Sequence, residues 1–246
     1  AAGGCMNSGL TALRLGLPGI PAIAEELMIQ RDILIAKETR GRYHVAHIST
    51  AGAVELVRQA KADGVAVTAE VCPHHLLLTD ESCGAYDTNY KMNPPLRSPN
   101  DVAACIAGVK DGTIDCLVTD HAPHGRESKE VDFQSAPFGI VGLEVALGLL
   151  AKALIEPGHL DWPQLIAKLT LNPAKILGID RGTLRRGAVG DITVIDPNRP
   201  WRVDTAAFRS KSRNCPYAGW DLPCQATHTI VGGQIKYAGP TLVKAA

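Results

Sequence analysis

The stretch V-T-D-H-A-P-H, residues 118–124, places one carboxylate and two imidazoles directly after an apolar run that begins at residue 114. A carboxylate at the end of a buried strand can bind a metal ion and can also accept a proton from metal-bound water. Asp120 is therefore a candidate metal ligand and base, and the alternative is an aspartate that caps the following turn. The spacing leaves open whether His121 and His124 are ligands, substrate contacts or neither.

Further imidazoles follow two other predicted strands. His47, in H-V-A-H-I-S-T, is a candidate zinc ligand, and the alternative is a core histidine whose hydrogen bonds are satisfied. His44, earlier in the same strand, is expected to be structural. Of His74 and His75, in V-C-P-H-H-L, at most one can face a site, because adjacent side chains point in different directions.

Asn93 lies in the proline-rich segment N-Y-K-M-N-P-P-L-R, which is predicted to be extended. Its amide carries donors and an acceptor, so it suits a substrate that has both kinds of group. An asparagine before a proline is also common in turns, and a purely structural role is the alternative.

Strands and helices alternate around these residues. Apolar, β-branched runs predict strands at residues 43–49, 65–71 and 114–119, and helical spacing predicts helices at 51–63, 101–110, 140–155 and 161–169. This alternation is typical of a parallel α/β layer. The polar residues collect beyond the carboxyl ends of the strands, where the sites of (β/α)₈ barrels and doubly wound sheets lie.

Two helix starts are also predicted. Pro21 suits the first turn of a helix within residues 16–36, and Asn100 is expected to cap the helix at 101–110. One apolar stripe is predicted on the earlier helix: Ile20, Ile23, Leu27, Leu34 and Ile35.

Beyond residue 175 the pattern changes to short alternating strands with turn glycines. Residues 226–237 predict a hairpin that turns at Gly232 and Gly233. This segment is expected to belong to a small β domain.

Composition narrows the functional classes. The 246 residues are 46% hydrophobic, and 25 basic residues balance 25 acidic ones, so no cationic field attracts nucleic acid or an anionic membrane. The seven cysteines form no C-x-x-C pair, which favours reduced thiols in a cytoplasmic protein. No apolar run is long enough for a membrane span, and no secretion signal is visible. No glycine-rich phosphate loop occurs either.

Together, these motifs resemble the amidohydrolase superfamily and, within it, the bacterial dihydroorotases of the type that partners aspartate transcarbamoylase. The segments that carry the resemblance extend along most of the chain: G-L-P-G-I-P-A-I-A-E-E, Y-H-V-A-H-I-S-T-A-G-A-V-E-L-V, V-T-A-E-V-C-P-H-H-L-L-L-T, Y-K-M-N-P-P-L-R, V-T-D-H-A-P-H, F-G-I-V-G-L-E, L-N-P-A-K-I-L-G and S-R-N-C-P-Y-A-G-W. Allantoinases and hydantoinases share some of these fragments, but K-M-N-P-P-L-R together with T-D-H-A-P-H resembles dihydroorotase.

The resemblance implies an α/β fold: the C-terminal part of a (β/α)₈ TIM-type metallohydrolase barrel plus strands of a small β-sandwich domain. Residues 1–175 would supply the last three barrel strands with their helices, and residues 176–246 the β segment. His47 would be a zinc ligand, and Asp120 both a zinc ligand and the catalytic acid and base. The implied substrate contacts are Asn93, His124, Phe138 and Gly139. The resemblance assigns no ligand role to His74, His75 or His121.

The implied activity is the zinc-dependent, reversible hydrolysis of the cyclic amide of (S)-dihydroorotate to N-carbamoyl-L-aspartate, in de novo pyrimidine biosynthesis. One or two zinc ions would be bound per complete site. The implied partners are this small-molecule substrate and either a second copy in a homodimer or aspartate transcarbamoylase. Nucleic acid and membrane are not expected as partners.

The sequence also departs from the family pattern. It contains neither the family's H-x-H pair with the adjacent arginine nor its H-C-E-D segment, so the chain is expected to be a C-terminal portion. Only His47 and Asp120 remain of the expected ligands, whereas a catalytic zinc usually has three. The chain alone is therefore expected to be inactive and poorly stable.

Two other functions stay open from the sequence. One is a non-catalytic dihydroorotase-like subunit that scaffolds aspartate transcarbamoylase, and the other is a different cyclic amidohydrolase such as allantoinase. The presence of His47, Asn93, Asp120 and His124 favours the enzyme over the scaffold.

Overall fold

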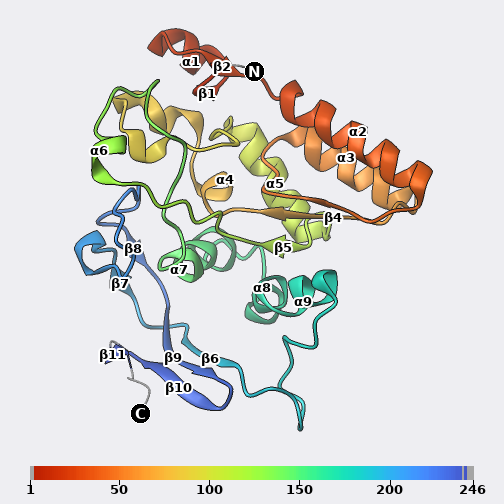
Figure 1. Ribbon diagram of the computed structural model, residues 1–246, viewed down its shortest axis with the longest axis vertical. Helices are drawn as coiled ribbons and strands as arrows, with labels where there is room; N and C mark the ends of the chain where they lie inside the picture. The colour runs from red at the N-terminus through yellow and green to blue at the C-terminus, as the bar shows by residue number, and fades with distance from the viewer. Residues whose placement is uncertain (1–2, 240, 243–246) are drawn as a thin grey trace. The chain divides into compact units, whose positions relative to one another are not determined.

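The computed structural model describes residues 3–239 and 241–242 (Figure 1). The chain forms two compact units. The first unit comprises residues 1–144 and 204–218, and the second comprises residues 145–203 and 219–246. The boundary predicted at residue 175 concerns the domains of a larger barrel protein; these units do not test it, and it stays a prediction.

A parallel sheet in the order β3-β4-β5 forms the centre of the first unit. The strands are β3 (Tyr43–Val45), β4 (Val67–Val71) and β5 (Cys116–Leu117). Helix α3 (Ala51–Ala62) connects β3 to β4, and α5 (Pro99–Asp111) precedes β5. All three strands lie within the predicted segments but are shorter, because the flanking residues turn away into loops. The predicted alternation of strand and helix is thereby confirmed.

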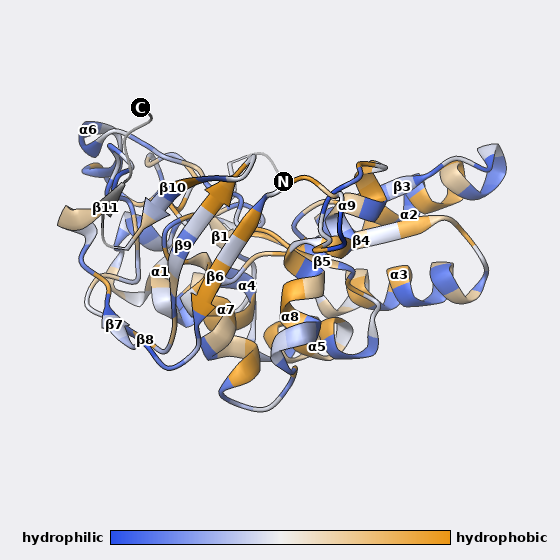
Figure 2. Cartoon of the chain, turned by 90° about the horizontal axis from the view of Figure 1, so that it is seen from below, coloured by the Kyte–Doolittle hydropathy of each residue, from blue (hydrophilic) through white to orange (hydrophobic). Residues whose placement is uncertain are grey.

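Helix α2 (Ile23–Thr39) follows a short parallel pair formed by β1 (Met6–Asn7) and β2 (Gly19–Ile20). The predicted apolar stripe is wrong as a core face. Its helical members are exposed, from 52% at Ile23 to 61% at Leu27, whereas Ile29, Ile33 and Ala36 are buried. Apolar residues occur on more than one side of α2, so the periodicity did not single out the packed face (Figure 2).

Helix α5 begins two residues earlier than predicted. The Ser98 hydroxyl accepts a hydrogen bond from the Asp101 N–H at 3.3 Å, and the Asp101 carboxylate accepts one from the Ser98 N–H at 3.2 Å. This reciprocal capping box satisfies two amides at the helix start and places Pro99 in the first turn. The prediction that Asn100 is the cap was therefore wrong.

Shorter elements complete the first unit. They are α1 (Leu10–Leu15), α4 (His74–Leu77), the 3₁₀ turns η1 (Asp80–Ala85), η2 (Thr88–Tyr90) and η4 (Thr205–Ala207), and α6 (Arg126–Lys129).

The second unit combines helices with an antiparallel sheet in the order β11-β10-β9-β6. Its helices are α7 (Ala146–Leu150), the π-helical turn η3 (Ala151–Ile155), α8 (Trp162–Leu169) and α9 (Leu171–Leu177). Its strands are β6 (Ile192–Asp196), β9 (Gln225–Val231), β10 (Gln234–Ala238) and β11 (Thr241–Leu242), with a separate pair β7 (Trp201–Arg202) and β8 (Asp221–Leu222). The predicted hairpin is confirmed: Gly232 and Gly233 both have positive φ between β9 and β10, as a tight hairpin turn requires.

Within residues 3–239 and 241–242, no helix combines the length and the hydrophobicity that crossing a membrane requires.

Candidate metal and substrate site

His47 and Asp120 share an unusual backbone conformation. Among the described residues, four that are not glycine have positive φ, and two of them, Arg40 and Tyr86, end helical segments. The other two are His47, at φ 38°, and Asp120, at φ 46°. Each lies two or three residues beyond a strand of the parallel sheet. Backbone strain of this kind, of order 1–3 kcal/mol per residue, is concentrated at functional sites.

The sheet brings both residues to one edge. Beyond β3, the Ile48 N–H donates to the Glu70 carbonyl at 2.9 Å, and beyond β5 the Val118 N–H donates to the Val71 carbonyl at 3.1 Å. Both chain segments therefore follow the carboxyl end of β4 on its two sides. With neighbouring strands roughly 5 Å apart, the two backbones are separated by about 10 Å across β4.

The donor set fits a zinc ion in part. An imidazole and a carboxylate are ordinary zinc ligands. Nδ1 of His47 is buried and has no hydrogen-bond partner, which leaves a nitrogen for another group to engage. The assignment of His47 and Asp120 as ligands stays a prediction, and two protein ligands are fewer than a catalytic zinc usually has.

A second group of potential ligands follows the middle strand. Donor atoms of Cys72, His74 and His75 lie within 4.8 Å of one another, and all three residues are buried. Nε2–H of His75 donates to the Pro94 carbonyl at 2.9 Å. Nδ1 of His75 and Nε2 of His74 are buried and have no hydrogen-bond partner. Burial lowers the pKa of His75 to about 4 and that of His74 well below its usual value, so both rings are neutral at pH 7.

The Cys72 side chain is a protonated thiol at pH 7. Burial, and to a lesser degree the negative charge of Asp120, raise the pKa of its thiol well above the usual value. A metal ion displaces the proton of a thiol that it binds, so this pKa does not decide whether the group can hold a metal.

Three of the predicted substrate contacts lie together. Nε2–H of His124 donates to the Phe138 carbonyl at 2.7 Å. Gly139 has φ 150°, and a Cβ added there would lie 2.7 Å from the His124 ring, so a side chain at this position would collide with the imidazole. The Gly139 N–H donates to the Lys91 carbonyl at 2.9 Å. Asn93, the fourth predicted contact, is exposed and follows the buried Met92, two residues beyond Lys91.

The remaining histidines near the site have structural partners. Nδ1 of His121 accepts hydrogen bonds from the N–H groups of Gly142 at 3.1 Å and Leu143 at 3.4 Å, which agrees with the absence of a ligand role in the family resemblance. His44 lies 2.7 Å from Thr68 Oγ1 and 2.9 Å from Glu70 Oε2, which agrees with a structural role.

Sequence reasoning did not single out a buried charged network next to His47. Arg97 is 2% exposed and donates to Ser49 Oγ at 3.1 Å and to Glu25 Oε2 at 3.3 Å. Glu25 also accepts from the Ser49 N–H at 2.8 Å and from the Ser49 hydroxyl. All three residues lie in segments that carry the family resemblance. That location was the signal that could have marked them as a group.

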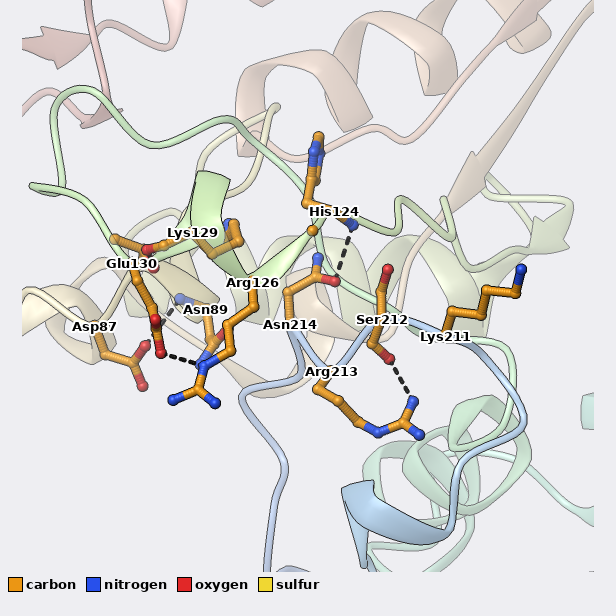
Figure 3. A pocket seen from close by; sticks show the side chains of 12 residues that line it. Asp87, Asn89, His124, Arg126, Lys129, Glu130, Lys211, Ser212, Arg213 and Asn214 are labelled. Carbon is orange, nitrogen blue, oxygen red and sulfur yellow. Dashed lines mark hydrogen bonds and ion pairs between the residues drawn. The ribbon is translucent and has the colours of Figure 1, made fainter.

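A cavity of about 400 Å³ lies beside His124 in the first unit (Figure 3). It is lined by residues of η2, of α6 and of the segment 211–214, among them Lys129 and Asn214. Burial, followed by the positive charge of Lys91, lowers the pKa of Lys129 to about 8. The sequence analysis assigned no role to Asn214, although its segment S-R-N-C-P-Y-A-G-W carries part of the family resemblance.

Comparison with solved structures confirms the α/β fold expected from the sequence. The chain is similar to the L-hydantoinase (dihydropyrimidinase) of Arthrobacter aurescens, with a TM-score of 0.84 and 29% identity over 89% of this chain and 50% of that chain. It is also similar to the dihydropyrimidinase of Brevibacillus agri NCHU1002, with a TM-score of 0.86 and 23% identity over 91% of this chain and 50% of that one. The second likeness concerns the fold alone.

Sequence comparison identifies the relatives. The chain is 56% identical to a dihydroorotase of Pelotomaculum thermopropionicum over 96% of its own length, and 52% identical to one of Geobacter sp. strain M21 over 95%. In both cases it spans 55% of the length of the relative. The model of the amidohydrolase family matches residues 22–236, and this chain therefore belongs to the amidohydrolase family.

Proposed function

We propose that this chain supplies the His47 and Asp120 side of a dihydroorotase site, which hydrolyses the cyclic amide of (S)-dihydroorotate reversibly to N-carbamoyl-L-aspartate. The observation that carries the proposal is the placement of these two residues, both with left-handed backbone, at the carboxyl ends of β3 and β5. The relatives named dihydroorotase support the substrate. The place of the reaction would be de novo pyrimidine biosynthesis in the cytoplasm.

The chemistry divides among a few side chains. A zinc ion held by His47, Asp120 and ligands from outside this chain would supply Lewis-acid polarisation of the amide and activation of water. Asp120 takes one proton from the attacking water and returns it to the ring nitrogen as the carbon–nitrogen bond breaks. The water oxygen stays on the former carbonyl carbon, and the carboxylic acid formed there releases the second water proton to solvent and becomes a carboxylate.

The other predicted residues orient the substrate. Asn93 offers an amide whose donors and acceptor match the alternating N–H and C=O groups of the ring. His124 stands beside the Phe138–Gly139 backbone and, with it, forms a second group of contacts. In the reverse direction the same contacts would hold N-carbamoyl-L-aspartate folded for ring closure.

The test is complementation. We expect the chain alone, with zinc, to open no dihydroorotate, because two ligands do not make a catalytic zinc site. Supplying the part of the Pelotomaculum dihydroorotase that this chain does not match, fused or co-expressed, should give ring opening that Asp120→Ala abolishes. Activity of the chain alone, or activity of the complemented Asp120→Ala variant, would contradict the proposal.

A broader cyclic-amide specificity is the second candidate, because the hydantoinase of Arthrobacter aurescens is structurally similar. A panel of dihydroorotate, hydantoin and allantoin, offered to the complemented enzyme, separates the two. A homodimer or a complex with aspartate transcarbamoylase is proposed as the assembly. Retained transcarbamoylase binding without any hydrolysis would instead identify a scaffold.

A further inference from the structure

We propose that Asn214 is a positioning residue that holds together the two backbone segments from which His124 and Gly139 reach the substrate. The inference rests on the proposed function for its kinetic consequence and on the hydrogen bonds of one side chain for its geometry.

The Asn214 amide uses both of its ends. Its Oδ1 accepts a hydrogen bond from the His124 N–H at 3.1 Å (Figure 3). Its Nδ2 donates to the Ala122 carbonyl at 2.9 Å and to the Gly139 carbonyl at 3.0 Å. The residue is 5% exposed, so water competes little for these bonds.

The backbone of Asn214 extends the same connection. Its carbonyl accepts a hydrogen bond from the Val141 N–H at 3.0 Å, two residues beyond Gly139. One residue therefore bonds both the loop after β5 and the segment around Gly139. Other bonds also join these segments: the Ala122 N–H donates to the Ile140 carbonyl at 3.0 Å, the His124 ring donates to the Phe138 carbonyl, and the Gly142 and Leu143 N–H groups donate to Nδ1 of His121.

Only an amide side chain of this length meets the demand. An aspartate would keep an acceptor for the His124 N–H but would turn a carboxylate oxygen toward the Ala122 and Gly139 carbonyls. Three acceptors would then face one another in a buried place; Lys129 Nζ, which donates to the Gly139 carbonyl at 3.2 Å, would offset part of this repulsion, and a proton on the carboxylate would remove it. The charge state of an aspartate at this position should therefore decide whether the side chain can bond both segments as the Asn214 amide does; we call this set of bonds the clamp.

The kinetic test uses the complemented enzyme. Asn214→Ala should lower kcat/KM for dihydroorotate about 10- to 100-fold, since a small misplacement of contact groups has effects of this size. Its zinc content should match that of the wild type. Asn89→Ala, at an asparagine that lines the same cavity from η2, is the matched control and should stay within about 2-fold of the wild type.

Two readouts separate positioning from a general loss of structure. The defect of Asn214→Asp relative to the wild type should shrink as the pH is lowered, because a protonated carboxyl can donate to one of the two carbonyls. The double variant Asn214→Ala with His124→Ala should be far less impaired than the product of the single defects, because both act through one group. A pH-independent Asn214→Asp defect, or independent single effects, would overturn the proposal.

A measurement on the chain itself does not depend on activity. Hydrogen exchange of the His124 amide should be at least about 10-fold faster in Asn214→Ala than in the wild type, while the amides of α3 keep their rates. An unchanged His124 rate would overturn the clamp even if the enzyme is a dihydroorotase. An inactive complemented wild type with the expected exchange pattern would overturn the proposed function and leave the clamp supported.

Discussion

At the scale of single residues, substitutions at Asp120 can distinguish the effect of its backbone conformation from the effect of its carboxylate. Its φ of 46° lies in a region that aspartate, asparagine and histidine tolerate better than other side chains. The residue types predicted to bind metal are thus also types that this backbone accepts. A substitution at Asp120 can therefore remove the carboxylate with or without adding strain.

We expect Asp120→Asn to change the free energy of unfolding by less than about 0.5 kcal/mol. Asp120→Val should cost about 1–2 kcal/mol more, because a β-branched residue is strained at positive φ. Urea unfolding of the two variants measures the difference. Equal stability of Asn and Val at this position would show that the left-handed conformation is not retained.

His75 is expected to make stability depend on pH. Its pKa is lowered to about 4 in the folded chain, chiefly by burial, with the nearby His47 and Arg97 acting in the same direction. In the unfolded chain it titrates near its ordinary value, so between pH 6.5 and pH 4 the unfolded state binds more protons. Stability therefore falls as the pH is lowered through this window, by at most about 3 kcal/mol from this residue.

The matched variant is His75→Gln, which can still donate to the Pro94 carbonyl but does not titrate. Urea unfolding at pH 7 and pH 4.5 should show a smaller loss for this variant than for the wild type. His74 titrates in both proteins, and the loss of its repulsion from a charged His75 reduces the pH dependence of the variant in the same direction. An identical loss in the two proteins would mean that His75 is not buried as a neutral ring.

At the scale of elements, Arg97 joins parts of the chain that the site depends on. It bonds Glu25 of α2 and Ser49, two residues beyond His47, and it also donates to the Ile20 carbonyl of β2 at 2.8 Å. The network therefore fixes the segment after β3 relative to α2 and β2. Elements α2 and β2, which have no predicted chemical role, thus help to fix the position of the segment that carries His47.

Arg97→Ala should destabilise the chain by about 3–5 kcal/mol, because it leaves the Glu25 carboxylate, 12% exposed, without its positively charged partner. Arg58→Ala is the control, since Arg58 pairs with Glu55 and Asp111 on the surface and should contribute less than about 1 kcal/mol. Denaturant titration of both variants tests the contrast. A loss at Arg97 no larger than at Arg58 would contradict the structural role.

The sequence predicted the elements better than their contacts. Strands β3, β4 and β5 were found because β-branched runs and the helices between them are local signals. The packed face of α2 was missed because its apolar residues lie on both sides. The role of Asn214 was missed because Ala122 is 92 residues away, and no local pattern encodes such a pair. The catalytic and substrate-binding roles came from the family resemblance and stay predictions.

At the scale of the whole molecule, α2 presents apolar side chains that the described residues leave exposed. Leu27 is 61% exposed and Leu34 56%, on one side of the helix. Exposed apolar side chains of this kind promote association between copies. The isolated chain is therefore expected to self-associate.

Leu27→Lys combined with Leu34→Lys should reduce this self-association while changing the free energy of unfolding by less than about 1 kcal/mol, since neither side chain is in the core. Ile33→Lys, at a buried position of the same helix, is the control and should destabilise the chain strongly. Sedimentation velocity measures association, and urea unfolding measures stability. Unchanged association of the double variant would place the contact elsewhere.

The seven buried cysteines can report how often each part of the protein opens. All seven are buried as free thiols, and burial raises the pKa values of Cys83 and Cys215 to about 12 and 11 and that of Cys105 well above its usual value. A thiol reagent therefore modifies each cysteine only when the surrounding element opens. Six of them lie in the first unit, and Cys224 lies in the second. Mass spectrometry of a labelling time course would thus time the opening of each unit separately, without any substitution in the chain.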